Sequence, residues 1–262
     1  MAFAIENNIT LLNPAFDEYC KFFASTEQDI IARHPSKKVR IYYKDFLRFS
    51  MYRFCCMPFK IHGKPDIEIK KIGKLVLFDI GWNQRFDFDN SDYKDQVSLI
   101  KRSSLVVLSG YYFLDTTDLY KHADKIREYF KPAPQYHQNI QRILKENRKK
   151  GEILIGVHIR QNDYKNFCGG IYFYTSQEYL KMMQKVEALF TGRKVTFLIC
   201  SDTNQKTDDF KRVSFGFGSG QIVEDLYSLA GCDYIIGPPS TFSGWASFYG
   251  NVPRLVMNNK EL

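Results

Sequence analysis

The sequence has 262 residues, enough for one large α/β domain or two modest ones, and it carries a formal net charge of +8. Its 44% hydrophobic and 25% charged residues are ordinary for a globular protein and exclude a disordered chain. A positive surplus of this size suits an anionic substrate or an acidic membrane surface. No helix-turn-helix, zinc-finger spacing or RNP-like pattern is present, so we expect no nucleic-acid partner.

The cysteines form neither a CxxC pair nor a repeated spacing, which argues against a zinc site and a disulfide framework. We expect reduced, mostly buried thiols. No apolar stretch of about 18 residues and no signal peptide occur. The expected location is the cytoplasm, with peripheral contact to a membrane as an alternative.

The chain begins with three short predicted elements. These are a helix over residues 1–7, a short strand over 9–12, and an amphipathic helix opened by Asn13-Pro14. Residues 33–62 then interleave Lys and Arg with aromatic side chains. We favour an amphipathic helix packed on its own domain here over one lying in a membrane interface.

From residue 74 strands and helices alternate. We predict a strand over 75–79, a helix over 92–102 capped by Asp92, a strand over 105–108 and a helix over 118–130. This alternation is typical of a parallel, doubly wound sheet.

The strongest break in the chain is the segment Lys131-Pro-Ala-Pro134. It divides the sequence into an N-terminal α/β domain, residues 1–133, and a C-terminal domain, residues 134–262. The second domain is predicted to open with a helix over 134–150.

Residues 151–164, GEILIGVHIRQNDY, combine a buried strand with polar side chains where it ends. His158, Arg160 and Asp163 follow the apolar run. Ligands of open α/β sheets bind in the crevice beyond the carboxyl ends of the strands. An Arg held there presents a planar fork suited to a phosphate.

The next segments continue the same alternation. A loop over residues 165–174 with Gly169-Gly170 and four aromatic residues is placed to move over a substrate. A helix follows to about residue 190, capped by Thr175 or Ser176 with Glu178 near the capping-box position.

Two further strand ends carry polar side chains. Ser201-Asp202 follows a strand over 195–199, and Asp202 is expected either to receive a hydroxyl of ribose or acceptor or to cap the next helix. Ser240 and Thr241 begin a helix that Gly250 is predicted to close. Their hydroxyls and the free amides of the first turn predict an anion site, although a simple helix cap needs only one of them.

The pattern His158-Ile159-Arg160-x-x-Asp163-Tyr164 resembles the HxRRxDY signature of the fucosyltransferases that use GDP-fucose, the α1,2-, α1,6- and protein O-fucosyltransferases. The order and spacing of the later polar residues are similar as well, so the resemblance covers residues 151–256. It implies an α/β, GT-B-like architecture of two Rossmann-like doubly wound domains. It also implies inverting transfer to a glycan or lipid-linked glycan from a nucleotide-sugar donor, with no other cofactor and no metal.

The resemblance also implies roles for single residues. Arg160 would grip the β-phosphate, and Asp163 would orient Arg160 or act as general base. The residues implied in donor binding are His158 and Asp225 for guanine, Ser240, Thr241 and Phe242 for the phosphates, and Ser201 and Asp202 beside them.

Two departures from the family pattern stand out. The second Arg of the signature is Gln161 here, and the first strand with its Gly-rich loop is missing, which indicates a truncated start or a degenerate member. Two alternatives therefore remain beside an active enzyme. One is a catalytically impaired GDP-sugar-binding relative, and the other is a basic adaptor for polyanions or membranes.

Overall fold

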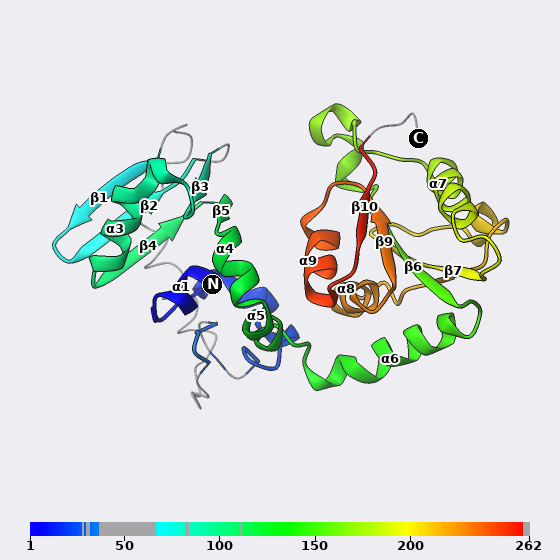
Figure 1. The fold of residues 1–262 in the computed structure, drawn as a ribbon, viewed down its shortest axis with the longest axis horizontal. Helices are drawn as coiled ribbons and strands as arrows, with labels where there is room; N and C mark the ends of the chain where they lie inside the picture. The colour runs from blue at the N-terminus through cyan, green and yellow to red at the C-terminus, as the bar shows by residue number, and fades with distance from the viewer. Residues whose placement is uncertain (28, 30–31, 37–66, 82–83, 111, 259–262) are drawn as a thin grey trace. The chain divides into compact units, whose positions relative to one another are not determined.

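A computed structural model describes residues 1–27, 29, 32–36, 67–81, 84–110 and 112–258. It divides into two compact units, Met1–Lys131 and Pro132–Leu262, two residues before the boundary expected from the sequence. The amphipathic helix predicted within 33–62 lies almost entirely outside the described residues. We describe each unit by itself (Figure 1).

The N-terminal unit begins with helices, as predicted, but its predicted first strand is wrong. Residue Leu11 forms only an isolated bridge with His34. The helix opened by Asn13-Pro14 is a 3-10 helix. The elements of the unit in order are α1 Ala2–Glu6, η1 Pro14–Phe22, β1 Glu68–Ile72, β2 Leu75–Asp79, β3 Arg85–Asp87, η3 Ser91–Tyr93, α3 Lys94–Arg102, β4 Leu105–Ser109, β5 Tyr112–Leu114, α4 Thr116–Lys121 and α5 Ala123–Tyr129.

The described strands of this unit form two small sheets. Strands β2 and β4 pair in parallel, as predicted, but β1 adds to β2 in the antiparallel sense, and β3 pairs with β5. Asn90, rather than the predicted Asp92, caps the helical segment that follows, because its side chain accepts from the amide of Asp92. The helix predicted over 118–130 is interrupted at His122.

The C-terminal unit contains one sheet of five parallel strands in the order β10-β9-β6-β7-β8. The chain moves outward from β6 through β7 to β8 and then returns to the other side of β6 with β9 and β10. The elements in order are α6 Pro134–Arg148, β6 Ile153–Ile159, η4 Asp163–Lys165, η5 Phe167–Gly170, α7 Ser176–Ala188, β7 Val195–Ser201, η6 Thr207–Phe210, β8 Phe215–Phe217, α8 Ile222–Ala230, β9 Tyr234–Gly237, α9 Thr241–Gly250 and β10 Arg254–Val256.

Helices cover both faces of this sheet, so the central strand β6 is buried at all seven positions (Figure 1). Alternate residues of β6 point to opposite faces. Ile155 and Val157 pack against α7, and Leu154 packs with residues of α6, α8 and α9. The apolar run read from the sequence is therefore buried on two sides, as parallel strands require.

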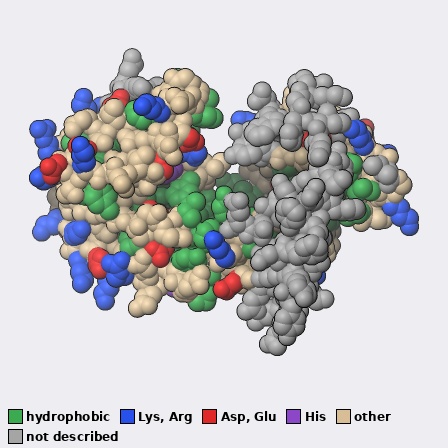
Figure 2. Space-filling model, turned by 180° about the vertical axis from the view of Figure 1, so that it is seen from behind, with side chains coloured by type: hydrophobic (Ala, Val, Ile, Leu, Met, Phe, Trp, Pro, Cys, Tyr) green, Lys and Arg blue, Asp and Glu red, His purple; other side chains and the backbone are tan. Residues whose placement is uncertain are grey.

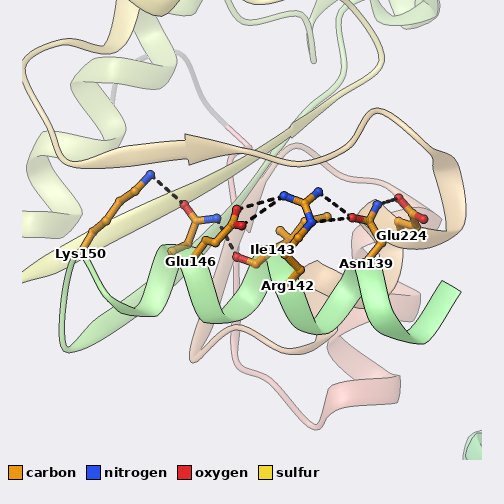
Figure 3. Close-up of polar contacts among 7 residues, drawn as sticks. Asn139, Arg142, Ile143, Glu146, Lys150 and Glu224 are labelled. Atoms are coloured by element: carbon orange, nitrogen blue, oxygen red, sulfur yellow. Dashed lines mark hydrogen bonds and ion pairs between the residues drawn. The ribbon is translucent and has the colours of Figure 1, made fainter.

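Polar contacts attach α6 to its neighbours (Figure 3). The guanidinium of Arg142 donates to Glu146 and to Asn139, and Asn139 donates to Glu224 on α8. At the end of the helix, Lys150 Nζ donates to the carbonyl oxygen of Phe215 on β8 at 3.0 Å. Lys150, an exposed basic residue just after α6, therefore also attaches this end of the helix to β8.

The predicted start of α7 is confirmed, whereas the predicted C-cap of α9 is wrong. Thr175 and Glu178 form the predicted capping box of α7. Helix α9 runs to Gly250, and its C-cap is Asn251 in the left-handed conformation rather than the predicted Gly250. Of the described cysteines, Cys168 is exposed, and the buried ones are Cys20, Cys200 and Cys232. Among the described helices, none is both long and apolar enough to cross a bilayer.

Candidate functional site

The candidate site lies at the carboxyl ends of the neighbouring strands β6 and β9. Between these two strands the direction in which the chain adds strands to the sheet reverses. Strand β6 leads on to β7 on one side, whereas β9 and β10 occupy the other. A crevice at such a reversal is the usual ligand site of open α/β sheets. Two of the predicted strand ends, that of Arg160 and that of Ser240, meet at this place.

Arg160 is the central side chain of the site. Its Nε and Nη2 donate to the two carboxylate oxygens of Asp163 at 2.9 and 2.6 Å, and Nη1 donates to Ser240 Oγ at 3.2 Å. Its guanidinium also lies 4.5 Å from the ring centroid of Tyr164. Hydrogen bonding to Asp163 raises the pKa of Arg160, so the group is charged at every physiological pH. Three contacts hold the guanidinium in one orientation.

A second contact joins the same two strand ends. The Tyr164 hydroxyl donates to the carbonyl oxygen of Pro239, one residue before Ser240. The loop after β6 is therefore attached to the loop after β9 by both Arg160 and Tyr164. This attachment fixes the distance between the guanidinium and the start of α9.

The start of α9 has the features of an anion site. Ser240 Oγ accepts from the amide of Phe242, so Ser240 is the N-cap. The Thr241 side chain is exposed and makes no hydrogen bond to a described residue, which leaves its hydroxyl available. Helix N-termini favour negative charge because their amides and dipole point toward it.

A further cation, Arg254 at the start of β10, was not predicted. Its Nη1 donates to the Ser240 carbonyl oxygen at 2.9 Å and to Ser243 Oγ at 3.2 Å. Burial lowers the pKa of this guanidinium. Nothing in the short segment Arg254-Leu-Val marks it as a strand in the sequence, and so its side chain could not be placed at the site.

His158 is buried beneath the site. Its ring lies 5.0 Å from that of Phe242, and its Nδ1 has no hydrogen-bond partner among the described residues. Burial, with the nearby charges of Arg160 and Arg254, lowers the pKa of His158 to about 4. The imidazole is therefore neutral near pH 7 and offers one unprotonated nitrogen as an acceptor.

Asp202 supports the loop that carries Arg160. Its carboxylate accepts from the backbone amides of Gln161 at 2.8 Å and Asn162 at 3.2 Å. The alternative that it caps the next helix is wrong, because Lys206 occupies the N-cap position of η6. The position of Asp202 in the structure is thus that of a support for the Arg160 loop.

Gln161, which replaces the second Arg of the family pattern, belongs to a separate polar network. Its amide donates to the carbonyl oxygen of Tyr174 at 2.8 Å and accepts from Thr203 Oγ1 and Gln205 Nε2 at 3.0 and 2.8 Å. Ser201 Oγ joins this network by accepting from Gln205 at 3.1 Å. Both side chains therefore have structural partners.

Asp225 is buried on α8. Its Oδ1 accepts from the amides of Ser219 and Gly220 at 2.8 and 3.3 Å. Burial nevertheless raises the pKa of Asp225. Within the described part of the chain, no hydrogen bond joins Asp225 to His158, the other residue predicted to read guanine. Oδ2 of Asp225 makes no hydrogen bond to a described residue.

One group of possible metal ligands lies in the N-terminal unit. Ligand atoms of Glu6, Asp118 and His122 lie within 4.8 Å of one another. The Glu6 carboxylate already accepts from Lys121 Nζ at 2.6 Å and contacts His122 Nε2 at 2.7 Å. The lysine supplies the positive charge that a metal ion would bring, so this group is accounted for as an ion-pair cluster.

No family model and no curated protein matches the chain. The solved structures that resemble it include the following three. A mutant of Arabidopsis thaliana FUT1 in complex with GDP has a TM-score of 0.59 at 12% identity and covers 98% of this chain and 66% of its own. The match to POFUT1 in complex with GDP has a TM-score of 0.47 at 14% identity and covers 64% of this chain and 59% of POFUT1. The match to the fucosyltransferase NodZ from Bradyrhizobium has a TM-score of 0.41 at 20% identity and covers 55% of this chain and 51% of NodZ.

The likeness to Arabidopsis FUT1 extends over nearly the whole chain and establishes the fold, whereas the other two fall below a TM-score of 0.5. The chain spans about 66% of that plant protein's length and 59% of POFUT1's. This chain therefore has an α/β fold like that of the Arabidopsis thaliana FUT1 structure.

Proposed function

We propose that this chain binds GDP-fucose in the crevice between β6 and β9 and transfers fucose, with inversion, to a hydroxyl group of a glycan. The observation that carries the proposal is the 3.2 Å contact from Arg160 Nη1 to Ser240 Oγ. It brings a charged guanidinium and a helix N-terminus to one point, and both groups suit a diphosphate. The structural neighbours crystallised with GDP support the same ligand.

In the proposed reaction the acceptor oxygen bonds to C1 of fucose as the bond from C1 to the β-phosphate oxygen breaks. GDP leaves with the electron pair of that bond, and the proton of the acceptor hydroxyl passes to an oxygen of the departing diphosphate or to water. Arg160 and the first turn of α9 would stabilise the charge that develops on the leaving phosphate. Because Arg160 and the positive end of the α9 dipole would both face the phosphates, we propose a reaction without a metal ion.

Asp163 fits the role of orienting Arg160 better than that of a general base. Both of its carboxylate oxygens accept hydrogen bonds from the guanidinium. Those bonds lower the pKa of Asp163, and a weaker base accepts a proton less readily. Asp163 would therefore act through Arg160.

We further propose that guanine lies against the face of the sheet that holds His158 and Asp225. The neutral imidazole and the Asp225 carboxylate both offer acceptors, which suits the N1–H and amine edge of guanine. The unpartnered Nδ1 of His158 would gain a hydrogen bond on binding.

Two alternatives predict different binding behaviour. A catalytically impaired relative would bind GDP tightly without hydrolysing or transferring the sugar. A basic adaptor would bind polyanions with a steep salt dependence and no preference for GDP over ADP. Figure 2 shows Lys and Arg side chains interspersed with acidic ones on the visible face of the C-terminal unit, and on that face they form no single basic patch.

Calorimetric titration with GDP, GDP-fucose and GDP-mannose tests the donor, and transfer is then measured with GDP-fucose in the presence of EDTA. We expect binding of GDP, tighter binding of GDP-fucose than of GDP-mannose, and activity that chelation does not abolish. Equal binding of GDP, ADP and UDP would contradict the donor assignment. Binding of GDP-fucose without turnover would favour the impaired relative.

A further inference from the structure

Ser240 follows β9, and it is held by two guanidinium groups that come from the strands on either side of β9. Arg160, which follows β6, donates to the Ser240 hydroxyl at 3.2 Å. Arg254, which begins β10, donates to the Ser240 carbonyl oxygen at 2.9 Å. The residue that caps the proposed phosphate-binding helix is thus fixed by one cation at its side chain and another at its backbone.

The two cations differ in what compensates their charge. Arg160 is paired with the Asp163 carboxylate through two hydrogen bonds. Arg254 contacts only neutral oxygens, those of Ser240 and Ser243, and within the described residues no carboxylate forms an ion pair with it. Taking a guanidinium partly out of water without an anion costs free energy, which an anionic ligand would recover.

The charge of Arg254 also acts on His158, the buried residue beneath the site. It is one of the two charges, with that of Arg160, that lower the pKa of the buried His158. Since His158 is consequently neutral, it adds no positive charge of its own. Gln161, which follows Arg160 in the sequence, is uncharged as well, and its side chain is bonded to Tyr174 and Gln205.

We propose that Arg254 is the positioning residue that supplies the uncompensated positive charge at the start of α9, and that this charge selects a diphosphate over a monophosphate. The inference rests on the proposed function only in taking the diphosphate to be that of GDP. Inorganic pyrophosphate, which has neither base nor sugar, tests the charge independently.

The experiment measures binding of GDP, GMP and pyrophosphate by calorimetry to the wild type and to three variants. Arg254→Gln removes the charge and Arg254→Lys keeps it. Arg193→Gln is the matched control. Arg193 forms an ion pair with Glu152 at 3.5 Å, and the two residues precede β7 and β6, at the amino-terminal ends of these strands and away from the candidate site. Circular dichroism verifies that each variant is folded.

We expect Arg254→Gln to weaken GDP and pyrophosphate binding by about tenfold or more and GMP binding by about threefold or less, since the second phosphate carries the additional charge. Arg254→Lys should stay within about threefold of the wild type for GDP. Arg193→Gln should bind as the wild type does. This pattern is specific to charge, because a loss of packing alone would weaken both nucleotides alike.

Equal loss of GDP and GMP binding in Arg254→Gln, not restored by Lys, would overturn the inference, as would unchanged GDP binding. If Arg254→Gln does not fold, a loss of about tenfold or more in GDP affinity for Arg254→Lys contradicts the charge role. Binding of pyrophosphate but not GDP by the wild type would overturn the proposed function and leave the role of Arg254 standing. Absence of both would overturn the two together.

Discussion

Replacing Arg160 by Ala should abolish stabilisation by GDP while leaving the protein folded. The Arg160 and Asp163 side chains are 31% and 52% exposed, so their ion pair contributes only about 0.5–1 kcal/mol to the free energy of unfolding. The melting temperature of the unliganded protein should fall by only about 2 °C. The variant thus remains usable for a binding measurement.

The effect on ligand binding should be much larger. At a GDP concentration 100 times the dissociation constant, binding adds about 2.7 kcal/mol to the free energy of unfolding, or roughly 8 °C in melting temperature. A bidentate contact from Arg160 to the β-phosphate is worth about 3 kcal/mol, which raises the dissociation constant by more than about 100-fold. At the same GDP concentration the shift should then fall to about 1 °C.

Thermal unfolding with and without GDP gives both quantities. Arg148→Ala is the matched control, because Arg148 also makes two 3.0 Å hydrogen bonds to one carboxylate, that of Asp233, away from the site. It should lower the melting temperature of the unliganded protein and keep the full GDP shift. A folded Arg160→Ala protein that retains the wild-type shift would refute the phosphate role of Arg160.

Other consequences follow from single contacts. The pKa of His158 is about 4 in the folded chain, below its unfolded value of about 6.5, so the unfolded state binds the extra proton and stability should fall as pH drops from about 6.5 to 4. Urea unfolding across that range checks this, and an equal slope in His158→Asn would contradict it. Gln161→Ala should cost about 1–3 kcal/mol, because Thr203 and Gln205 lose their acceptor; chemical denaturation that shows no change would exclude the network as a stabilising one. Gly156→Ala places its new Cβ 2.6 Å from Leu229 Cδ2 and should cost about 1–3 kcal/mol in thermal unfolding, with unaltered stability as the contrary result.

The long elements of the C-terminal unit could be predicted because their local patterns agree with their packing. The apolar run that ends at Ile159 is buried on both faces, and Thr175 caps its helix as its spacing to Glu178 suggests. The short strands β8 and β10 have three residues each, too few to show a period of two. They exist because they pair with β7 and β9, which a local pattern does not reveal.

The candidate site was predictable in part. The strand-end rule placed Arg160 and Ser240 at one edge of a sheet, and they are in contact. The partners of Asp202 lie about 40 residues away along the chain, and those of Arg254 are on another element, so neither role could be derived from spacing. Side chains whose partners are distant in sequence need the fold before they can be assigned.

A crystal structure of the chain with GDP bound would test the proposed phosphate site. We expect one β-phosphate oxygen within hydrogen-bonding distance of Arg160 and another facing the first-turn amides of α9 beside Thr241. A diphosphate bound elsewhere, or one that contacts α9 but leaves Arg160 pointing away from it, would refute this site.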